Sequence, residues 1–482
     1  MTDATTTTPM TVRFGRLPRR GLLLGLSSSR ILCLSISALV FVPAIFLGSS
    51  TGAGLTAPLW GGLIALAFVR WHGRPAVESL PTAGHYAVRK LNGQTKFRAR
   101  PSAPRPGGTL ALPGDAAALR FLIDEESGEA MLHDPHAHTL TAVALVRHPA
   151  YVLLSSDEQA RRVHGWGRAL ASLAASGTGC RLQVLEVSLP DAGRGITGWW
   201  EVNGVKQPGQ WAVQQYESLM KTAAPAASTH RTVLALSLDL RSARAHIKQA
   251  GRGLRGAAAF LRQEMTSLEA GLRAADLSLA TWLNESELAA TLRESFEPGH
   301  ETGDAGTQTL ASAGPVAMDE EWDHVRHDTA YSAVLWVSEW PRVGAPPYFL
   351  HSLVFQPGIR KTLSMTIQPI PADAAMRDIR KAKVEYATEA AQKAKIGAIA
   401  DLSDSAERDD VLERERALIS GHADVKLTGL ISITAPSRDE LEASVAEISR
   451  AAIQCGCETR RLYGQQARAF VSASLPLARK VS

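Results

Sequence analysis

An uncharged stretch of 39 residues runs from Ile31 to Val69, with arginines on both sides. A turn rich in glycine and serine, Gly48–Gly54, divides it into two apolar segments, Ile31–Leu47 and Leu55–Trp71. A helix needs roughly 20 apolar residues to cross a bilayer, with a range of about 17–25. The sequence therefore predicts a transmembrane helical hairpin over residues 30–72, which crosses twice and returns the chain to its starting side.

Basic residues flank both ends of this hairpin. Those nearest to it are Arg19, Arg20, Arg30, Arg70 and Arg74, and Arg13, Arg16, Arg89 and Lys90 lie further out. Positive residues close to membrane ends stay on the cytoplasmic side. We therefore expect a protein of the cell membrane with two spans, a basic cytoplasmic N-terminal segment over residues 1–29, and a cytoplasmic C-terminus.

Two other interpretations of the uncharged stretch compete with a hairpin. A cleaved signal peptide is disfavoured by the polar segment that precedes the stretch, by the second apolar segment, and by the lack of a clear small-residue cleavage site. A pair of buried core helices does not explain why neither segment has a polar face.

Composition sets broad limits on the remaining 400 or so residues, which suffice for about two or three domains. The net charge is +5 and the pI about 9.0. Anionic lipid beside the membrane explains this positive charge, and contact with DNA is permitted as well. The 4 cysteines form no disulfide framework, which suits a reducing cytoplasm. Cys455-Gly-Cys457 lacks the spacing of a metal site.

Strands and capped helices alternate after the hairpin. Thr139–Arg147 alternates apolar and polar residues as a half-buried strand does. Ser155-Ser-Asp-Glu158 is a capping box that begins a helix, and Arg181–Ser188 is again a strand. The same order recurs in Gly429–Thr434, Ser437-Arg-Asp-Glu440 and Glu458–Tyr463. This order is half of a split βαβ unit, so we expect an α+β fold with ferredoxin-like domains.

The segment between these units adds further elements. Apolar residues at helical spacing predict one long helix over residues 242–274, and Asn284 can cap another helix over Glu285–Phe296. Strands are expected at Arg231–Leu240, Leu277–Trp282, Ala330–Trp336 and Thr362–Ile370. Residues 372–420 are rich in Ala, Lys, Arg and Glu, which predicts a long helical pair that is either solvated or rests on a partner.

These patterns divide the chain into seven expected segments. They are the N-terminal segment 1–29, the hairpin 30–72, a linker 73–108, a first α/β subdomain 109–230, a second α/β subdomain 231–371, the helical pair 372–425 and a C-terminal βαβ element 426–482. The linker is inferred from Pro101-Ser-Ala-Pro-Arg-Pro-Gly-Gly108.

No motif for nucleotide hydrolysis is present in the sequence. A G-x-x-x-x-G-K-[ST] loop is absent, so backbone amides and a lysine that hold phosphates are not available. Gly251-Arg-Gly-Leu-Arg-Gly256 lacks the Lys-Ser/Thr pair. Phe121-Leu-Ile-Asp124-Glu125 imitates a Walker B strand, but such runs are common without the first motif.

Two polar clusters remain. His133-Asp134-Pro-His136-Ala-His138 could suit zinc, but a polar turn around Asp134-Pro135 explains it better. The densest cluster contains Trp322, Asp323, His324, Arg326, His327 and Asp328. Asp, His and Arg can carry out acid–base chemistry, and His324 and His327 could face one way on a helix. We rank a structural brace above an interface patch, and an interface above catalysis. No catalytic, cofactor-binding or metal-binding residue is assigned.

Several of these features together resemble a known family. They are the basic N-terminus with its double span, Gly314-Pro-Val-Ala317, Glu321-Trp-Asp-His-Val-Arg-His-Asp328, Trp340-Pro-Arg342, the helical pair, and Tyr463-Gly-Gln-Gln466. The chain resembles actinobacterial integrative-element conjugation proteins, in which a PrgI-like membrane hairpin is fused to a domain similar to the N-terminal domain of the type IV secretion assembly ATPase.

This resemblance implies a non-enzymatic inner-membrane anchor and scaffold that seats a separate motor ATPase for DNA transfer, within an oligomeric complex. The EccE-type subunit of type VII secretion has a similar architecture and is the alternative. A membrane-anchored transferase is a third hypothesis, but no convincing D-x-D motif is present.

Overall fold

The structure is a computed structural model of the full chain. It describes residues 14, 26–71, 73–100, 107–110, 112–147, 151–190, 194–204, 210–223, 228–297, 309–342, 344–395, 402–479 and 481. The fold combines helices with an antiparallel sheet, and it divides into two units. The smaller unit contains residues 17–95 and 463–465, and the larger unit contains most of the remainder.

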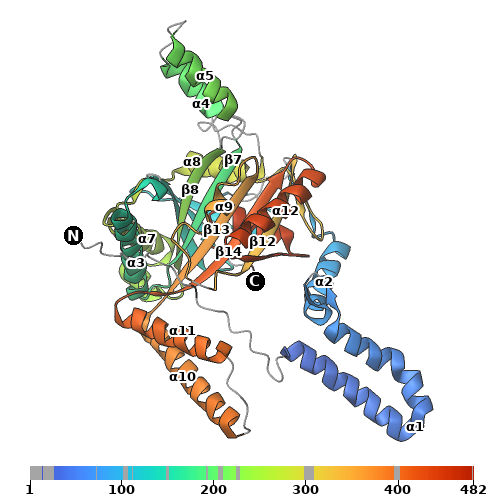
Figure 1. Ribbon diagram of the computed structural model, residues 1–482. Helices are drawn as coiled ribbons and strands as arrows, with labels where there is room; N and C mark the ends of the chain where they lie inside the picture. The colour runs from blue at the N-terminus through green and yellow to red at the C-terminus, as the bar shows by residue number, and fades with distance from the viewer. Residues whose placement is uncertain are drawn as a thin grey trace. The chain divides into compact units, whose positions relative to one another are not determined.

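The smaller unit contains two helical stretches that are long and apolar enough to cross a membrane, Ser28–Gly48 and Ser50–Phe68. Together they form α1 (Ser28–Phe68), which Figure 1 shows folded back on itself. The Ser37 hydroxyl donates to the Trp60 carbonyl over 2.9 Å. The Phe41 and Trp60 rings pack edge to face at 5.0 Å. These contacts hold the two stretches against each other.

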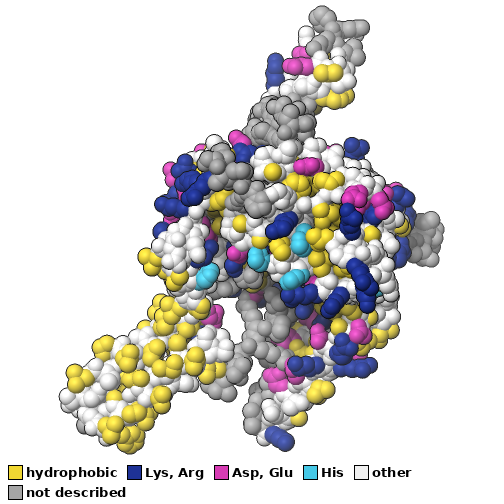
Figure 2. Space-filling view, turned by 180° about the vertical axis from the view of Figure 1, so that it is seen from behind, with side chains coloured by type: hydrophobic (Ala, Val, Ile, Leu, Met, Phe, Trp, Pro, Cys, Tyr) yellow, Lys and Arg dark blue, Asp and Glu magenta, His cyan; other side chains and the backbone are white. Residues whose placement is uncertain are grey.

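Apolar side chains of α1 face outward. Figure 2 shows them gathered over the hairpin, and Leu39 and Phe46 are 73% and 83% exposed. A short ribbon of β1 (Arg70–Trp71) and β2 (Arg74–Pro75) follows α1. Part of the expected linker 73–108 is regular structure, α2 (Ala76–Leu91) and the strand β3 (Lys96–Arg98). Residues 101–106 of the proline-rich run from which the linker is inferred lie outside the described residues.

The larger unit is built on a 13-stranded sheet, in which each described strand pairing is antiparallel. The main path is β3-β10-β11-β12-β14-β13-β7-β8-β6-β5-β4, and β15 and β9 pair with β12 and β6. The strands not yet given are β4 (Arg120–Ile123), β5 (Ala130–Asp134), β6 (Thr139–Arg147), β7 (Arg181–Pro190), β8 (Ser228–Asp239), β9 (Ser278–Trp282), β10 (Ala317–Glu320), β11 (Val325–His327), β12 (Ala330–Glu339), β13 (Arg360–Ile370), β14 (Asp424–Ala435) and β15 (Glu458–Arg461).

This sheet consists of two halves with the same chain order. The first half runs β6, α3 (Ser156–Ala175), β7, β8, α7 (Gly253–Arg273) and β9, and its strands lie in the order β9-β6-β8-β7. The second runs β12, α9 (His351–Val354), β13, β14, α12 (Arg438–Gln454) and β15, in the order β15-β12-β14-β13. Each half therefore places its fourth, first, third and second strands side by side.

The elements around the two halves are repeated as well. A hairpin precedes each half, β4–β5 in the first and β10–β11 in the second. A helix follows each half, α8 (Glu285–Phe296) and α13 (Gln466–Ser474). Even single hydrogen bonds recur, because Leu283 N–H donates to the Val143 carbonyl and Leu462 N–H donates to the Val334 carbonyl.

The halves join through equivalent strands, since β7 pairs with β13 along the middle of the sheet. A twofold rotation about an axis perpendicular to the sheet exchanges two neighbouring antiparallel strands. This rotation leaves each face of the sheet on its own side. Accordingly α3, α7, α9 and α12 pack on one face, and α8 and α13 pack on the other.

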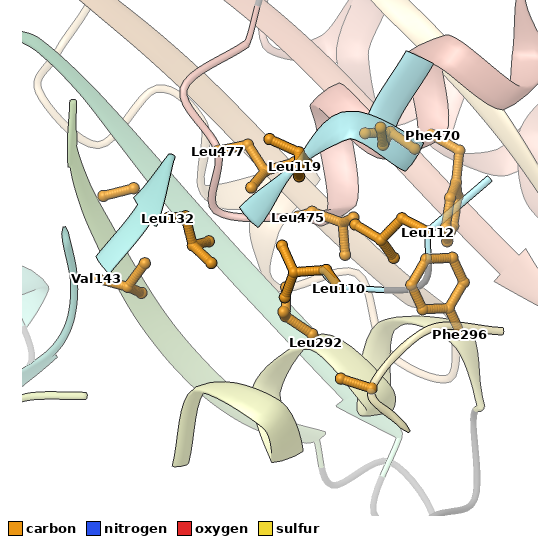
Figure 3. Packing of buried hydrophobic residues seen from close by; sticks show 14 of the residues in the cluster. Leu110, Leu112, Leu119, Leu132, Val143, Leu292, Phe296, Phe470, Leu475 and Leu477 are labelled. Carbon is orange, nitrogen blue, oxygen red and sulfur yellow. The ribbon is translucent and has the colours of Figure 1, made fainter. Parts of the chain in front are cut away.

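The core on the α8 and α13 face is continuous across both halves. Leu110, Leu112 and Leu119, which precede β4, fill the space between these helices and the sheet. Figure 3 shows Phe296 of α8 beside Phe470 of α13, and the two ring centroids lie 5.5 Å apart. This packing ties the chain end to the first half.

A helical pair is inserted into the same connection of each half. The first half carries α4 (Arg194–Asn203) and α5 (Trp211–Ala223) between β7 and β8. The second half carries α10 (Ala372–Lys395) and α11 (Leu402–Ile419) between β13 and β14. Because β7 and β13 are antiparallel, the two insertions leave the sheet at opposite ends, as Figure 1 shows. The α10–α11 pair occupies the segment in which the sequence predicts two helices.

One predicted helix is broken in the structure. The segment 242–274 forms α6 (Arg244–Gln249) and α7, separated by a turn at Gly251–Gly253. A β-carbon at Gly256 would lie 2.7 Å from the Ile247 carbonyl oxygen. The glycines therefore allow α6 and α7 to approach closely, an arrangement that the apolar periodicity does not encode.

The structure groups the strands differently from the expected subdomains. The boundary at residue 230 falls inside β8, which forms a hairpin with β7, and the boundary at residue 425 falls inside β14. The two units of strand, capped helix and strand that look alike in sequence also occupy different positions. The unit β6–α3–β7 begins the first half, and the unit β14–α12–β15 ends the second. Strand pairing between distant segments sets these groupings.

Candidate functional site

The cluster from Trp322 to Asp328 lies on a β-hairpin rather than on a helix. It begins after β10, includes β11 and ends in the turn to β12. β11 pairs with β10 on one side and with the start of β12 on the other. Alternation along β11 buries Val325 and His327 and leaves Arg326 exposed, so the hairpin directs His324 and His327 into different surroundings.

His327 is fully buried and both of its ring nitrogens are bonded. Nδ1 lies 2.7 Å from the Phe296 carbonyl, and Nε2 lies 2.7 Å from the Ser332 hydroxyl, which lies 2.7 Å from the Thr434 hydroxyl. A carbonyl only accepts, so Nδ1 carries the proton and Nε2 of the neutral ring accepts from Ser332. Burial lowers the pKa of His327 to about 4.

Asp328 closes the turn between β11 and β12 in a left-handed conformation, with φ of 44°. Its Oδ1 accepts hydrogen bonds of 2.8 Å from the Val316 and Ala317 N–H groups. Its Oδ2 lies 3.2 Å from Arg293 of α8. The same arginine donates to the Gly314 carbonyl over 2.7 Å, so Asp328 fastens the hairpin to α8.

The outer residues of the cluster form a polar surface. The Asp323 carboxylate lies 2.8 Å from His324 Nδ1 and 3.3 Å from Arg438 of α12. Burial opposes ionisation of Asp323, but the hydrogen bond from His324 and nearby positive charge hold its pKa below the usual range. Arg326 lies over the Tyr331 ring at 5.7 Å, and Trp322 is half-buried.

This geometry favours structural contacts over acid–base chemistry at the inner residues. A general base needs an accessible nitrogen or oxygen within reach of a substrate, and both nitrogens of His327 are committed to the protein interior. The exposed Arg326 and half-buried Trp322 leave a small patch on the surface, which is the part of the cluster available to a partner.

The histidines at 133–138 form a turn at the end of β5. The Asp134 carboxylate accepts from the His136 and Ala137 N–H groups over 3.0 Å, and its other oxygen pairs with Arg479 at 2.8 Å. These contacts account for the Asp-Pro sequence as a turn. Within the described residues, no group of three or more His, Cys, Asp and Glu side chains is arranged to hold a metal.

The Walker B-like run also has structural contacts. Asp124 accepts from the Ser127 hydroxyl over 2.9 Å and lies 3.1 Å from Arg262 of α7. Its carboxylate therefore connects the β4–β5 turn to a helix that packs on the sheet. No neighbouring feature of a phosphate loop accompanies it in the sequence.

The structure describes three of the five arginines that are predicted to flank the membrane spans. Arg30 lies in the first turn of α1, and Arg70 is exposed in β1. Arg74 lies in β2, and Arg19 and Arg20 lie outside the described residues.

Sequence reasoning missed one polar group, at the junction of the two halves. Arg231 of β8, Arg360 of β13 and Glu294 of α8 line one cavity beside the sheet. Each is an ordinary charged residue within its own strand or helix, and only the strand order brings them together. Nothing in the local sequence marks them.

No protein-family model matches this chain, and comparison with curated proteins gives no significant match.

Proposed function

We propose that this protein is a non-enzymatic membrane anchor and scaffold subunit of a secretion or conjugation machine. The observation that carries the proposal is the α1 hairpin, whose two stretches are uncharged after Arg30 and present apolar side chains outward. Such a surface is costly in water and favourable in a bilayer. A large antiparallel-sheet unit in the same chain supplies the part that a partner would recognise.

The proposed location is the cell membrane, with both termini in the cytoplasm. The support is the distribution of charge, because Arg30 lies at the start of the first span, Arg70 and Arg74 follow the second, and the turn between the spans has none. A hairpin of two spans necessarily returns the chain to the side on which it entered.

The proposed fold class of each half is ferredoxin-like. The β-α-β-β-α-β order and the strand sequence fourth-first-third-second support this assignment. In this interpretation the sheet unit is a tandem of two such domains, and the α10–α11 pair, held together by contacts such as Tyr386 with Glu407 at 3.1 Å, is an added feature of the second.

The proposed partner is a separate motor ATPase of the type IV kind, within an oligomeric complex at the membrane. This rests on the sequence resemblance around Glu321–Asp328 and on the absent phosphate loop, since a chain without that loop would depend on another polypeptide for ATP hydrolysis. Direct DNA contact is not needed for such a role.

The decisive experiment is a pull-down of the tagged full-length protein from its native membrane in mild detergent, followed by mass spectrometry. Recovery of a conjugative hexameric ATPase supports the proposal. Recovery of type VII core subunits moves the assignment to the EccE-type alternative. Stoichiometric, micromolar binding of ATP to the purified full-length protein in equilibrium dialysis would contradict the scaffold role.

A further inference from the structure

A small cavity lies where the two halves of the sheet meet, on the face that α8 and α13 cover. Its floor contains Leu185 and Thr362 of the central strands, and Ser295 of α8 lies on its wall. The cavity volume is about 20 Å³, and a water needs roughly 10–15 Å³ on this scale. The space therefore admits about one oxygen atom of a ligand, while the rest of that ligand would stay outside.

Two arginines enter this cavity from different halves. Arg231 pairs with the Glu294 carboxylate, and Arg360 donates to the Glu294 carbonyl over 2.5 Å. No carboxylate within the described residues pairs with Arg360. Burial lowers the pKa of Arg360 to about 10, and the positive charge of Arg231 contributes. Two like charges thus lie close together in a partly desolvated place.

A purely structural role in the fold explains only part of the placement of these two arginines. Glu294 neutralises one of the two charges, and the carbonyl to which Arg360 donates belongs to the last turn of α8, where a cation is favourable. However, a guanidinium has five N–H donors, and Arg231 Nε is buried with no hydrogen-bond partner in the described structure. An unpaired buried donor costs about 1–3 kcal/mol.

We propose that this cavity binds an oxyanion, the terminal group of a phosphate- or carboxylate-bearing ligand. Arg231 and Arg360 supply the positive charge, and the Thr362 hydroxyl supplies a further donor at the cavity floor. An anion there satisfies the free guanidinium donors and separates the two like charges, which is how arginine forks recognise phosphate and carboxylate. Because the contacts come from β8 of the first half and β13 of the second, the bound anion bridges the two halves.

The test is anion-dependent thermal stability of the full-length protein in nonionic detergent. Sodium phosphate and sodium acetate are each compared with sodium chloride at matched ionic strength, because screening alone changes surface electrostatics. A ligand that binds only the folded state raises the unfolding midpoint in a saturable way. The expected result is a saturable rise with phosphate or acetate beyond chloride, and the larger of the two responses identifies the group.

Variants separate the cavity from general charge effects. Arg360→Gln is expected to raise the apparent dissociation constant by about tenfold or more, as loss of a charged hydrogen bond predicts. Thr362→Val, which keeps the shape and charge of the cavity, is expected to raise the apparent dissociation constant by roughly fivefold, as loss of one neutral hydrogen bond predicts. This variant covers the case in which the arginine variant does not fold. Arg326→Gln, which is exposed on β11 outside the cavity, is the matched control and should bind as the unmodified chain does. An equal rise of the unfolding midpoint in all three salts would overturn the proposal. So would unchanged binding in Thr362→Val, if Arg360→Gln either binds unchanged or does not fold.

Discussion

Leu185 of β7 lies directly opposite Ser364 of β13. The two residues occupy the same position in their respective halves, because each lies four residues after the strand partner of an equivalent residue, Ser237 of β8 or Thr434 of β14. The pair therefore marks the pseudo-twofold axis that relates the halves. The cross-strand hydroxyl pair of Thr141 and Ser237, at 3.0 Å, has its counterpart in Ser332 and Thr434, at 2.7 Å. One chain thus builds a sheet in which two similar units share a continuous hydrogen-bonded ladder.

Acidification is expected to destabilise the fold through His327. Its folded-state pKa, about 4, lies below the value of roughly 6.5 for an unfolded histidine. The unfolded chain therefore binds more protons between these values, and stability falls as pH decreases from about 6.5 to 4. The loss should reach about 3 kcal/mol. Denaturant unfolding across this pH range measures the loss. The change of the free energy of unfolding with pH should diminish in His327→Gln and persist in His136→Gln, whose side chain is exposed.

Removing the charge of Asp328 is expected to lower the free energy of unfolding by about 1–3 kcal/mol. The carboxylate accepts two main-chain N–H groups and pairs with Arg293 in a buried setting. Asp328→Asn is the suitable variant, because asparagine tolerates the left-handed backbone. Asp319→Asn disrupts only the more exposed pair with Arg98 and should cost less than about 1 kcal/mol. Equal losses in both variants would contradict a bracing role for Asp328.

Two glycines on α3 are expected to respond oppositely to alanine. A β-carbon at Gly165 would lie 2.5 Å from the β-carbon of Ala275, whereas one at Gly167 would meet nothing closer than 4.0 Å. Gly165→Ala should destabilise the protein by about 1–3 kcal/mol through overpacking. Gly167→Ala should stabilise it by about 0.5–1 kcal/mol through helix propensity. Chemical denaturation of both variants checks the pair, and a gain in Gly165→Ala would refute the close contact.

A charge in the hairpin is expected to weaken membrane integration. Leu39 lies within the first stretch and is 73% exposed in the protein, so in the proposed orientation it faces lipid. Arginine at the centre of a span costs roughly 2.5–3.5 kcal/mol on insertion scales. Leu39→Arg should shift protein into the carbonate-extractable fraction, while Leu153→Arg, at an exposed position of the larger unit, should not. Equal extraction of both would argue against a membrane-spanning hairpin.

Local sequence patterns predicted the capped helices and the alternating strands. The N-caps of α3, α8 and α12 are Ser155, Asn284 and Ser437, as predicted, and each N-cap side chain accepts from the N–H group three residues later. Strand β6 coincides with the predicted Thr139–Arg147. Capping and alternation act over a few residues, so their consequences can be predicted without knowledge of the fold.

The surroundings of the polar cluster could not be predicted in the same way. The sequence shows an unusual concentration of polar and aromatic residues from Trp322 to Asp328. The partners of His327, however, come from α8 and β12, and those of Asp328 come from α8, the residue before β10 and the first residue of β10. Whether an imidazole is a base or a buried bonded ring depends on these distant groups.

The sequence by itself determined the uncharged hairpin, the capped helices and the alternating strands, because hydropathy and capping depend on neighbours along the chain. Only the tertiary structure decided that β7 pairs with β13, that the two halves are equivalent, and that Arg231 and Arg360 share one cavity. Antiparallel pairing joins segments that are far apart in sequence, and the choice among strands is made by the complementarity of whole faces in the core.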